Sequence, residues 1–324
     1  HLNIPGYIFD IRREILGSLQ YVKNLTPKDK AVNVFLWTGD CNPDTDALAV
    51  AEDAGILAMN GGDTVITKEN PSWTAIAPIG VQKGSYFQIY APNQNENVYT
   101  ELWTKRFYGY ERVIETFEMT NRPYRFKPIN IYHHMYSATK LASLNALKKV
   151  YNYALKQDVI AFYASEYIKA ARNFNRIAIG KTSKGYLIAG NDAIREFRIP
   201  KTTGYPNLDG SVIGFSDHEQ DRYIHLAPLR KHEITLAQTS RQKQAYIESV
   251  NAVIVTWNPT QKGINFTIQS HQPVVTMRLG NMQGCTIRIN DKAHPMRMVG
   301  NGIAAVEIKG KADVLQKISV RCAD

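Results

Sequence analysis

The chain has 324 residues, 44% of them hydrophobic, which is enough to bury a large core and to form two domains. Its formal net charge of +10 comes from basic residues that are spread along the chain. They form no stripe interleaved with aromatic residues, so a nucleic-acid-binding protein is not expected. No run of about 18 apolar residues occurs either, so we expect no membrane span. Because the chain starts at His1 without a signal sequence, we expect a processed or partial chain whose targeting cannot be read from it.

The first half of the chain repeats one unit, in which a short apolar strand leads through a polar loop into an amphipathic helix. Asn42 and Pro43 mark the start of one such helix and Gly55 marks its end. Further helices are expected at about residues 10–25, 111–118, 141–155 and 165–174. Strands are expected at residues 32–37, 56–59, 85–90, 130–136 and 159–163. Strands that alternate with helices predict a parallel sheet, and the number of units predicts a (β/α) barrel, or part of one, over residues 1–175.

The pattern changes at Arg176, and residues 176–324 show short strands separated by turn residues. This pattern is typical of an all-β sandwich, which we expect at about residues 244–324. The charged stretch at about residues 217–243 is expected to connect the earlier strands to the sandwich. The fold class is therefore α/β followed by all-β.

A histidine pair stands at the end of the predicted strand 130–136, directly before a helix. Catalytic groups of parallel α/β barrels lie at the carboxyl ends of the strands, and histidine titrates near neutral pH. We therefore expect His134 or His133 to point into a site. The alternative is a histidine that is satisfied within a strand.

Three other strand ends carry polar groups that would meet at the same barrel mouth: Asp40, Asn60 with Asp63, and Glu166. Simpler roles remain open for each, namely charge at a helix start for Asp40, a plain glycine turn for residues 60–64, and a helix cap at Ser165 beside Glu166. Aromatic faces and amides suit sugar rings, which predicts a substrate site from Trp73, Tyr90, Asn93 and Asn95.

The three cysteines form no zinc-binding pattern. Cys285 and Cys322 both lie in the β-rich region and could pair in an oxidising compartment, whereas Cys41 lies in the first half. Because no Gly-x-Ser-x-Gly motif occurs, a serine nucleophile is not supported. Metal-assisted hydrolysis and carboxylate-based glycoside cleavage remain.

Several long runs resemble the deacetylase region of the Pel polysaccharide modification proteins, which is similar to the polysaccharide deacetylases of carbohydrate esterase family four. The runs are Trp37-Thr38-Gly39-Asp40-Cys41, residues 60–64, residues 91–97, residues 108–116 and residues 164–168. The resemblance implies a distorted (β/α) barrel and a periplasmic enzyme that removes acetyl groups from an N-acetylhexosamine exopolysaccharide. It also implies export-complex proteins as partners and, because the family is exported, a disulfide between Cys285 and Cys322.

The resemblance further implies roles for individual residues. His134 matches the family's late motif, a strand that ends in a histidine near the leaving group, and Asp63 is the candidate for the carboxylate that orients it. Asp40 stands where the family usually has an arginine. The family uses a divalent metal ion, expected to be zinc, but its Asp-Asp and His-x-x-x-His motifs do not occur here, so we expect the metal ligands to lie outside this chain.

Two alternatives to a deacetylase remain at this point. The first is a glycoside hydrolase with paired carboxylates such as Asp40 and Glu166, whose separation would have to match one of the two standard distances. The second is a carbohydrate-binding or scaffold module without catalytic activity, which the missing metal motifs favour.

Overall fold

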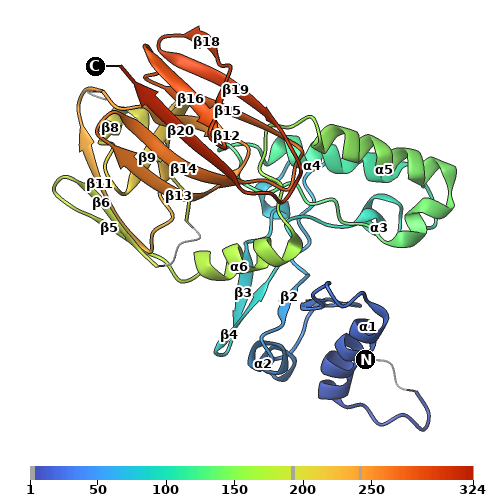
Figure 1. Cartoon of the computed structure of the whole chain (residues 1–324). Coiled ribbons are helices and arrows are strands. Elements are labelled where there is room, and N and C mark those ends of the chain that lie inside the picture. Colours follow the sequence, from blue (N-terminus) through green and yellow to red (C-terminus); the bar gives the residue numbers. More distant parts are fainter. Residues whose placement is uncertain (1–3, 191–193, 241–242, 324) are drawn as a thin grey trace. The chain divides into compact units, whose positions relative to one another are not determined.

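The computed structural model describes residues 4–190, 194–240 and 243–323 (Figure 1). The chain divides into two compact units. Unit 1 contains residues 1–157 and 164–172, and unit 2 contains residues 158–163 and 173–324. The main chain thus enters unit 2 after Arg172, whereas the predicted boundary followed residue 175.

The prediction of a (β/α) barrel is wrong. The described residues contain 20 strands in five sheets but only six α-helices, and the sheets do not close into a barrel. In unit 1, β1 (Val34–Leu36) pairs in parallel with β2 (Leu57–Met59), and β3 (Gly80–Lys83) pairs antiparallel with β4 (Tyr86–Ile89). In place of the expected strands, residues 130–134 and 159–163 are loops and residues 135–136 begin a 3-10 helix, so the repeated strands that a barrel needs do not form.

The helices of unit 1 follow the predicted ones closely, although some ends differ. Asp44, and not Asn42, caps α2, because its side chain accepts a hydrogen bond from the N–H of Ala47. Gly55 follows the end of this helix with a φ of 67°, as expected of a glycine in that place. Ser165 lies inside α6 and does not cap it. The elements are the π-helix η1 (Arg13–Gly17), the α-helices α1 (Ser18–Leu25), α2 (Thr45–Asp53), α3 (Glu96–Tyr99), α4 (Val113–Met119), α5 (Leu141–Ala154) and α6 (Ala164–Phe174), and the 3-10 helices η2 (Trp73–Ala75), η3 (Gly109–Arg112) and η4 (Met135–Thr139).

Unit 1 has several small hydrophobic clusters. One lies between α2 and the strands β1 and β2, and another joins α4 to α5 through Val113, Phe117 and Val150, each at most 1% exposed. The second cluster also contains Tyr99, the last residue of α3, and Tyr110 of η3. Both α3 and the loop before η4 pack against this cluster, through Tyr99 and through Ile129 and Ile131.

Unit 2 is built from antiparallel strands that follow the sequence prediction well. A seven-stranded sheet has the order β18-β19-β15-β12-β9-β10-β7, a five-stranded sheet has the order β13-β14-β20-β16-β17, and a four-stranded sheet has the order β5-β6-β11-β8. Only β12 and β9 pair in parallel within these sheets, among the described residues. The strands are β5 (Ala178–Lys181), β6 (Gly185–Ala189), β7 (Glu196–Pro200), β8 (Tyr205–Pro206), β9 (Val212–His218), β10 (Asp221–Leu226), β11 (Lys231–Ala237), β12 (Tyr246–Val250), β13 (Val253–Thr260), β14 (Gly263–Gln269), β15 (Val274–Gly280), β16 (Cys285–Ile289), β17 (Lys292–His294), β18 (Arg297–Gly300), β19 (Ile303–Lys309) and β20 (Gln316–Cys322), with the 3-10 helix η5 (Lys201–Thr203).

The core of unit 2 is compatible with the predicted β-sandwich. Alternate residues of β14, β15, β19 and β20 are buried in one large cluster that joins the seven-stranded and the five-stranded sheets. Cys285 and Cys322 face each other across β16 and β20 and form a disulfide. The charged stretch 217–243 is not a simple connection, because it contains the whole of β10 and of β11.

The described part of the chain offers no helix with the length and apolar character that a membrane crossing requires.

Candidate functional site

His134 is held by a buried carboxylate that the sequence analysis did not select. Oε1 of Glu96 accepts a hydrogen bond from the backbone N–H of His134 at 2.9 Å and lies 2.9 Å from Nδ1 of its ring. Ser137 donates a third hydrogen bond to the same oxygen at 3.0 Å. The side chain of Glu96 is 1% exposed and that of His134 is 40% exposed. A buried acceptor thus fixes one edge of a ring whose other side reaches solvent.

The contact with Glu96 determines which ring nitrogen of His134 is available for proton transfer. When Nδ1 carries the hydrogen that is donated to the carboxylate, Nε2 is the nitrogen that accepts or donates a proton. We therefore assign the Nδ1–H tautomer to neutral His134 from its hydrogen-bond partner. His133 lies differently, since its ring makes an edge contact with Tyr151 of α5, with ring centres 6.3 Å apart.

Glu96 is positioned by its own short helix. Asn95 caps α3 by accepting a hydrogen bond from the N–H of Asn97 at 3.0 Å, so this predicted substrate residue has a structural contact. Thr100, which is fully buried, donates to the carbonyl of Glu96 at 2.9 Å. The two contacts hold Glu96 from both ends of the helix.

Asn60 joins the ends of the parallel strands to the segment that carries His134. Its side-chain nitrogen donates to the carbonyl of Trp37 at 2.8 Å and to the hydroxyl of Tyr132 at 2.5 Å. Gln88 of β4 in turn donates to the carbonyl of Asn60 at 2.8 Å. At the carboxyl ends of β1 and β2, Asn60 therefore meets Tyr132, whereas the predicted convergence was of Asp40, Asn60 with Asp63, His134 and Glu166.

Asp63 lies close to this network but its carboxylate has another partner. Gln94 donates a hydrogen bond to Oδ1 of Asp63. The carboxylate bonded to His134 is thus Glu96, and not Asp63 as the resemblance implies. Gly61 and Gly62 precede Asp63 with φ values of 92° and 93°, and a Cβ atom on Gly62 would lie 2.6 Å from the ring of Tyr90. The two glycines therefore let Tyr90, a predicted substrate residue, pack onto the loop.

The surroundings of Cys41 disfavour its thiolate. Burial, and then the negative charges of Asp63 and Asp40, raise the pKa of the Cys41 thiol above its ordinary value. Its Sγ donates to the carbonyl of Trp37 at 3.2 Å. The thiol is therefore a poor nucleophile, and the two acidic residues lie near it.

The remaining predicted residues lie apart from the Glu96–His134 pair or have local partners. Asp40 is exposed and accepts a hydrogen bond from the N–H of Asn42 at 3.2 Å. Asn93 is buried and donates to the carbonyl of Gln94. Trp73 is 57% exposed and contacts the edge of Phe126. Glu166 lies in the first turn of α6.

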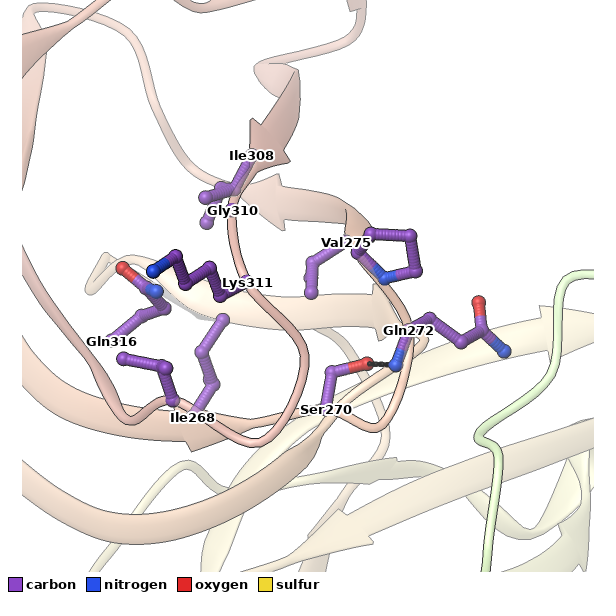
Figure 2. A pocket seen from close by; sticks show the side chains of 10 residues that line it. Ile268, Ser270, Gln272, Val275, Ile308, Gly310, Lys311 and Gln316 are labelled. Carbon is purple, nitrogen blue, oxygen red and sulfur yellow. Dashed lines mark hydrogen bonds between the residues drawn. The ribbon is translucent and has the colours of Figure 1, made fainter.

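Two small pockets of unit 2 contain none of the residues around His134. A pocket at one end of the sandwich, between the loop at Ser270 and Gln272 and the loop at Lys311, encloses about 10 Å³ (Figure 2). A second one, next to Trp257, encloses about 80 Å³. Sites for small organic ligands usually enclose about 300–1,000 Å³, so neither of these two pockets is a candidate. The candidate site is the surface at His134, whose side chain is 40% exposed.

The residues present do not fit the divalent metal that the resemblance implies. Among residues 4–190, 194–240 and 243–323, no group of three His, Cys, Asp or Glu side chains is placed to hold a metal ion. Oε2 of Glu96 is buried and has no hydrogen-bond partner within this set, yet a single carboxylate oxygen is a poor metal site. We therefore derive no step of the chemistry through a metal.

Comparisons with models of protein families, with curated proteins and with solved structures found no match for this chain.

Proposed function

We propose that this chain takes part in the N-deacetylation of a polysaccharide, with His134 as the residue that moves the proton. The observation that carries the proposal is the Glu96–His134 pair, in which a buried carboxylate bonds Nδ1 and the backbone N–H of a half-exposed histidine. Such a carboxylate holds the ring in one orientation and one tautomer, as general acid and base catalysis requires.

The reaction needs one proton to be moved twice. Water adds to the carbonyl carbon of the N-acetyl group and loses a proton to Nε2 of His134. The C–N bond of the tetrahedral intermediate then breaks, and the nitrogen leaves with the proton returned by Nε2. The products are a hexosamine with a free amine and acetic acid, which then loses its proton to become acetate, and the imidazole ends in its starting state. Glu96 stabilises the imidazolium between the two steps, because it places a negative charge 2.9 Å from Nδ1.

An acetylated hexosamine polysaccharide is the proposed substrate. The sequence runs that resemble the Pel polysaccharide deacetylases support it, and so do the aromatic rings of Tyr132 and Tyr136, whose centres lie 6.3 Å and 4.9 Å from that of His134. A periplasmic location is proposed together with it, because the disulfide between Cys285 and Cys322 is typical of an oxidising compartment. Periplasmic export proteins as partners rest on the resemblance alone.

Acetate release from N-acetylglucosamine and N-acetylgalactosamine oligomers tests the proposal, measured on the native protein with any residues that precede His1. His134→Ala should lower turnover by a factor of about 10²–10⁴, the usual contribution of general acid–base catalysis. Glu96→Gln should also lower it, because the neutral amide no longer stabilises the imidazolium. His133→Ala is the matched control, since it removes an adjacent imidazole that does not contact Glu96, and it should stay near the wild-type rate.

Two outcomes would contradict the proposal. Equal losses for His133→Ala and His134→Ala, with both variants folded by circular dichroism, would show that the Glu96 contact does not select the catalytic ring. Oligomer binding without acetate release by the wild type would instead identify a carbohydrate-binding module.

A further inference from the structure

A row of aromatic rings leads away from His134 in unit 1; Tyr136 is 37% exposed, Trp103 and Phe107 are half-buried, and Nζ of Lys140 lies 4.4 Å from the centre of the Phe107 ring. The ring of Tyr136 is nearly parallel to that of His134, with ring centres 4.9 Å apart and an angle of 5°. Trp103 contacts Tyr136 at 4.9 Å between ring centres, and Phe107 contacts Trp103 at 5.1 Å. We call the three rings of Trp103, Phe107 and Tyr136 the aromatic wall.

The backbone that presents Trp103 is in an unfavourable conformation. Glu101, Leu102 and Trp103 have φ values of 50°, 58° and 64°, so three successive residues other than glycine are left-handed. Such a conformation costs free energy at each of these residues, and runs of it are rare. Strained backbone of this kind is often found where a ligand is bound. The position of Trp103 is thus difficult to explain by local preference alone.

The turn is fixed to the same short helix that carries Glu96. The N–H of Trp103 donates to Oγ1 of Thr100 at 3.0 Å, and the N–H of Leu102 donates to the carbonyl of Asn97 at 2.9 Å. Asn97 also accepts a hydrogen bond from the hydroxyl of Tyr136 at 3.0 Å. One segment therefore sets both the carboxylate that holds His134 and the aromatic wall beside it.

We propose that the aromatic wall is a sugar-binding subsite for the hexosamine residue that follows the one whose acetyl group is at His134. A pyranose ring offers an apolar C–H face and a polar rim, and aromatic side chains with a polar handle, such as Tyr and Trp, suit that combination. Because the ring of Tyr136 stacks on that of His134, a sugar bound at the wall lies next to the histidine. This inference deepens the proposed function and rests on it for the reaction, but the binding itself can be tested separately.

Binding of N-acetylglucosamine and N-acetylgalactosamine pentamers to this chain, measured by calorimetry, tests the subsite directly. Trp103→Ala should raise the Kd of at least one of the two pentamers about tenfold, since a lost aromatic stacking partner is worth about a factor of ten in affinity. Trp103→Phe keeps an aromatic face and should recover much of that loss. Leu102→Ala is the matched control, because Leu102 is 77% exposed in the same left-handed turn, and it should bind like the wild type.

The outcomes separate this inference from the proposed function. If Trp103→Ala and Leu102→Ala bind both pentamers as the wild type does, while His134→Ala still abolishes acetate release, the subsite is refuted and the deacetylase proposal stands. If pentamer binding depends on Trp103 but no acetate is released, the subsite stands and the catalytic proposal fails. Tighter binding of a short oligothymidylate than of either pentamer, also lost in Trp103→Ala, would refute the sugar assignment.

Discussion

Lys127 is a buried lysine whose charge should make the stability of unit 1 depend on pH. Its side chain is 8% exposed, and burial lowers the pKa of Lys127 from its ordinary value of 10.5 to about 8. The contact found for its Nζ is the carbonyl of Pro78 at 3.4 Å, which is a weak hydrogen bond. The folded protein therefore keeps a cation in a place that favours the neutral amine.

The direction of the effect follows from proton binding. Between about pH 8 and about pH 10.5 the unfolded chain keeps the proton that the folded chain has released, so the free energy of unfolding rises with pH in this interval. At about 1.4 kcal/mol for each pKa unit, the full difference is about 3 kcal/mol. Below about pH 8 both states are protonated, and the folded state carries the whole penalty. Lys127→Met should thus stabilise unit 1 by up to about 3 kcal/mol at neutral pH and by little above about pH 10.5.

Urea unfolding of wild type and Lys127→Met at several pH values, followed by tryptophan fluorescence, measures this difference. Unit 1 contains three of the four tryptophans, so the signal reports mainly on it. Lys148→Met, at an exposed lysine of α5, is the control and should give the wild-type pH dependence. The reasoning is refuted if Lys127→Met keeps the rise in stability above about pH 8, or if it is less stable than the wild type at neutral pH.

Two further predictions concern a thiol and a buried histidine. Because its pKa is raised, Cys41 should react with a thiol reagent more slowly in the folded protein than free cysteine does at the same pH. Denaturation without a reductant should expose one reactive thiol per chain, and a count of three thiols would rule out the disulfide. Burial lowers the pKa of His232, which is 1% exposed in β11, so the stability of unit 2 should fall as the pH drops below about 6.5, where the unfolded histidine takes up a proton first. His232→Leu should weaken this acid dependence in urea unfolding followed by circular dichroism, and an unchanged pH profile would contradict the assignment.

The strands of unit 2 could be predicted from the sequence because alternation of apolar and polar residues is a local signal. β14, β15 and β19 lie in the region where the sequence predicts short strands, and buried and exposed residues alternate along each of them. β11 (Lys231–Ala237) is an exception, because it lies in the charged stretch that the sequence predicts to be a connection. Lys231 and Glu233 are exposed while His232 and Ile234 are buried, so this strand does alternate. The high charge of the surrounding stretch makes that alternation hard to recognise in the sequence.

The sequence could not exclude a barrel, because the composition of a short apolar run does not determine whether it pairs with another strand. Residues 130–136 have the β-branched and aromatic composition of a strand, yet they are held by side chains of other segments: Asn60 donates to the hydroxyl of Tyr132, and Glu96 accepts from the N–H of His134. Strand propensity reflects packing in a sheet and not a preference of the isolated backbone. Without neighbouring strands the same residues form an extended loop, and the repeated unit of a barrel is lost.

Glu96 was missed because its role depends on a contact across 38 residues of sequence. It stands in the polar run Asn93–Asn97, which reads as an exposed loop, and nothing in that pattern indicates that the carboxylate is buried. Asn95 as a cap, followed directly by Glu96 in the first turn, was the available local signal of a helix there. The residue that was chosen instead, Asp63, follows two glycines and was therefore more conspicuous.

The contacts of Glu96 with His134 and Ser137 hold the short helix α3 in place, and the contact with His134 is also the one on which the proposed catalysis depends. A helix of four residues is not stable by itself, and a buried carboxylate costs several kcal/mol unless hydrogen bonds offset the lost hydration. Three hydrogen-bond contacts with His134 and Ser137 offset that cost, and Thr100 links the helix to the strained turn at Trp103. The orientation of His134 and the position of the aromatic wall are therefore coupled, because a change that releases Glu96 also removes the support of Trp103. In this arrangement, recognition of the polymer and movement of the proton depend on one segment of the chain.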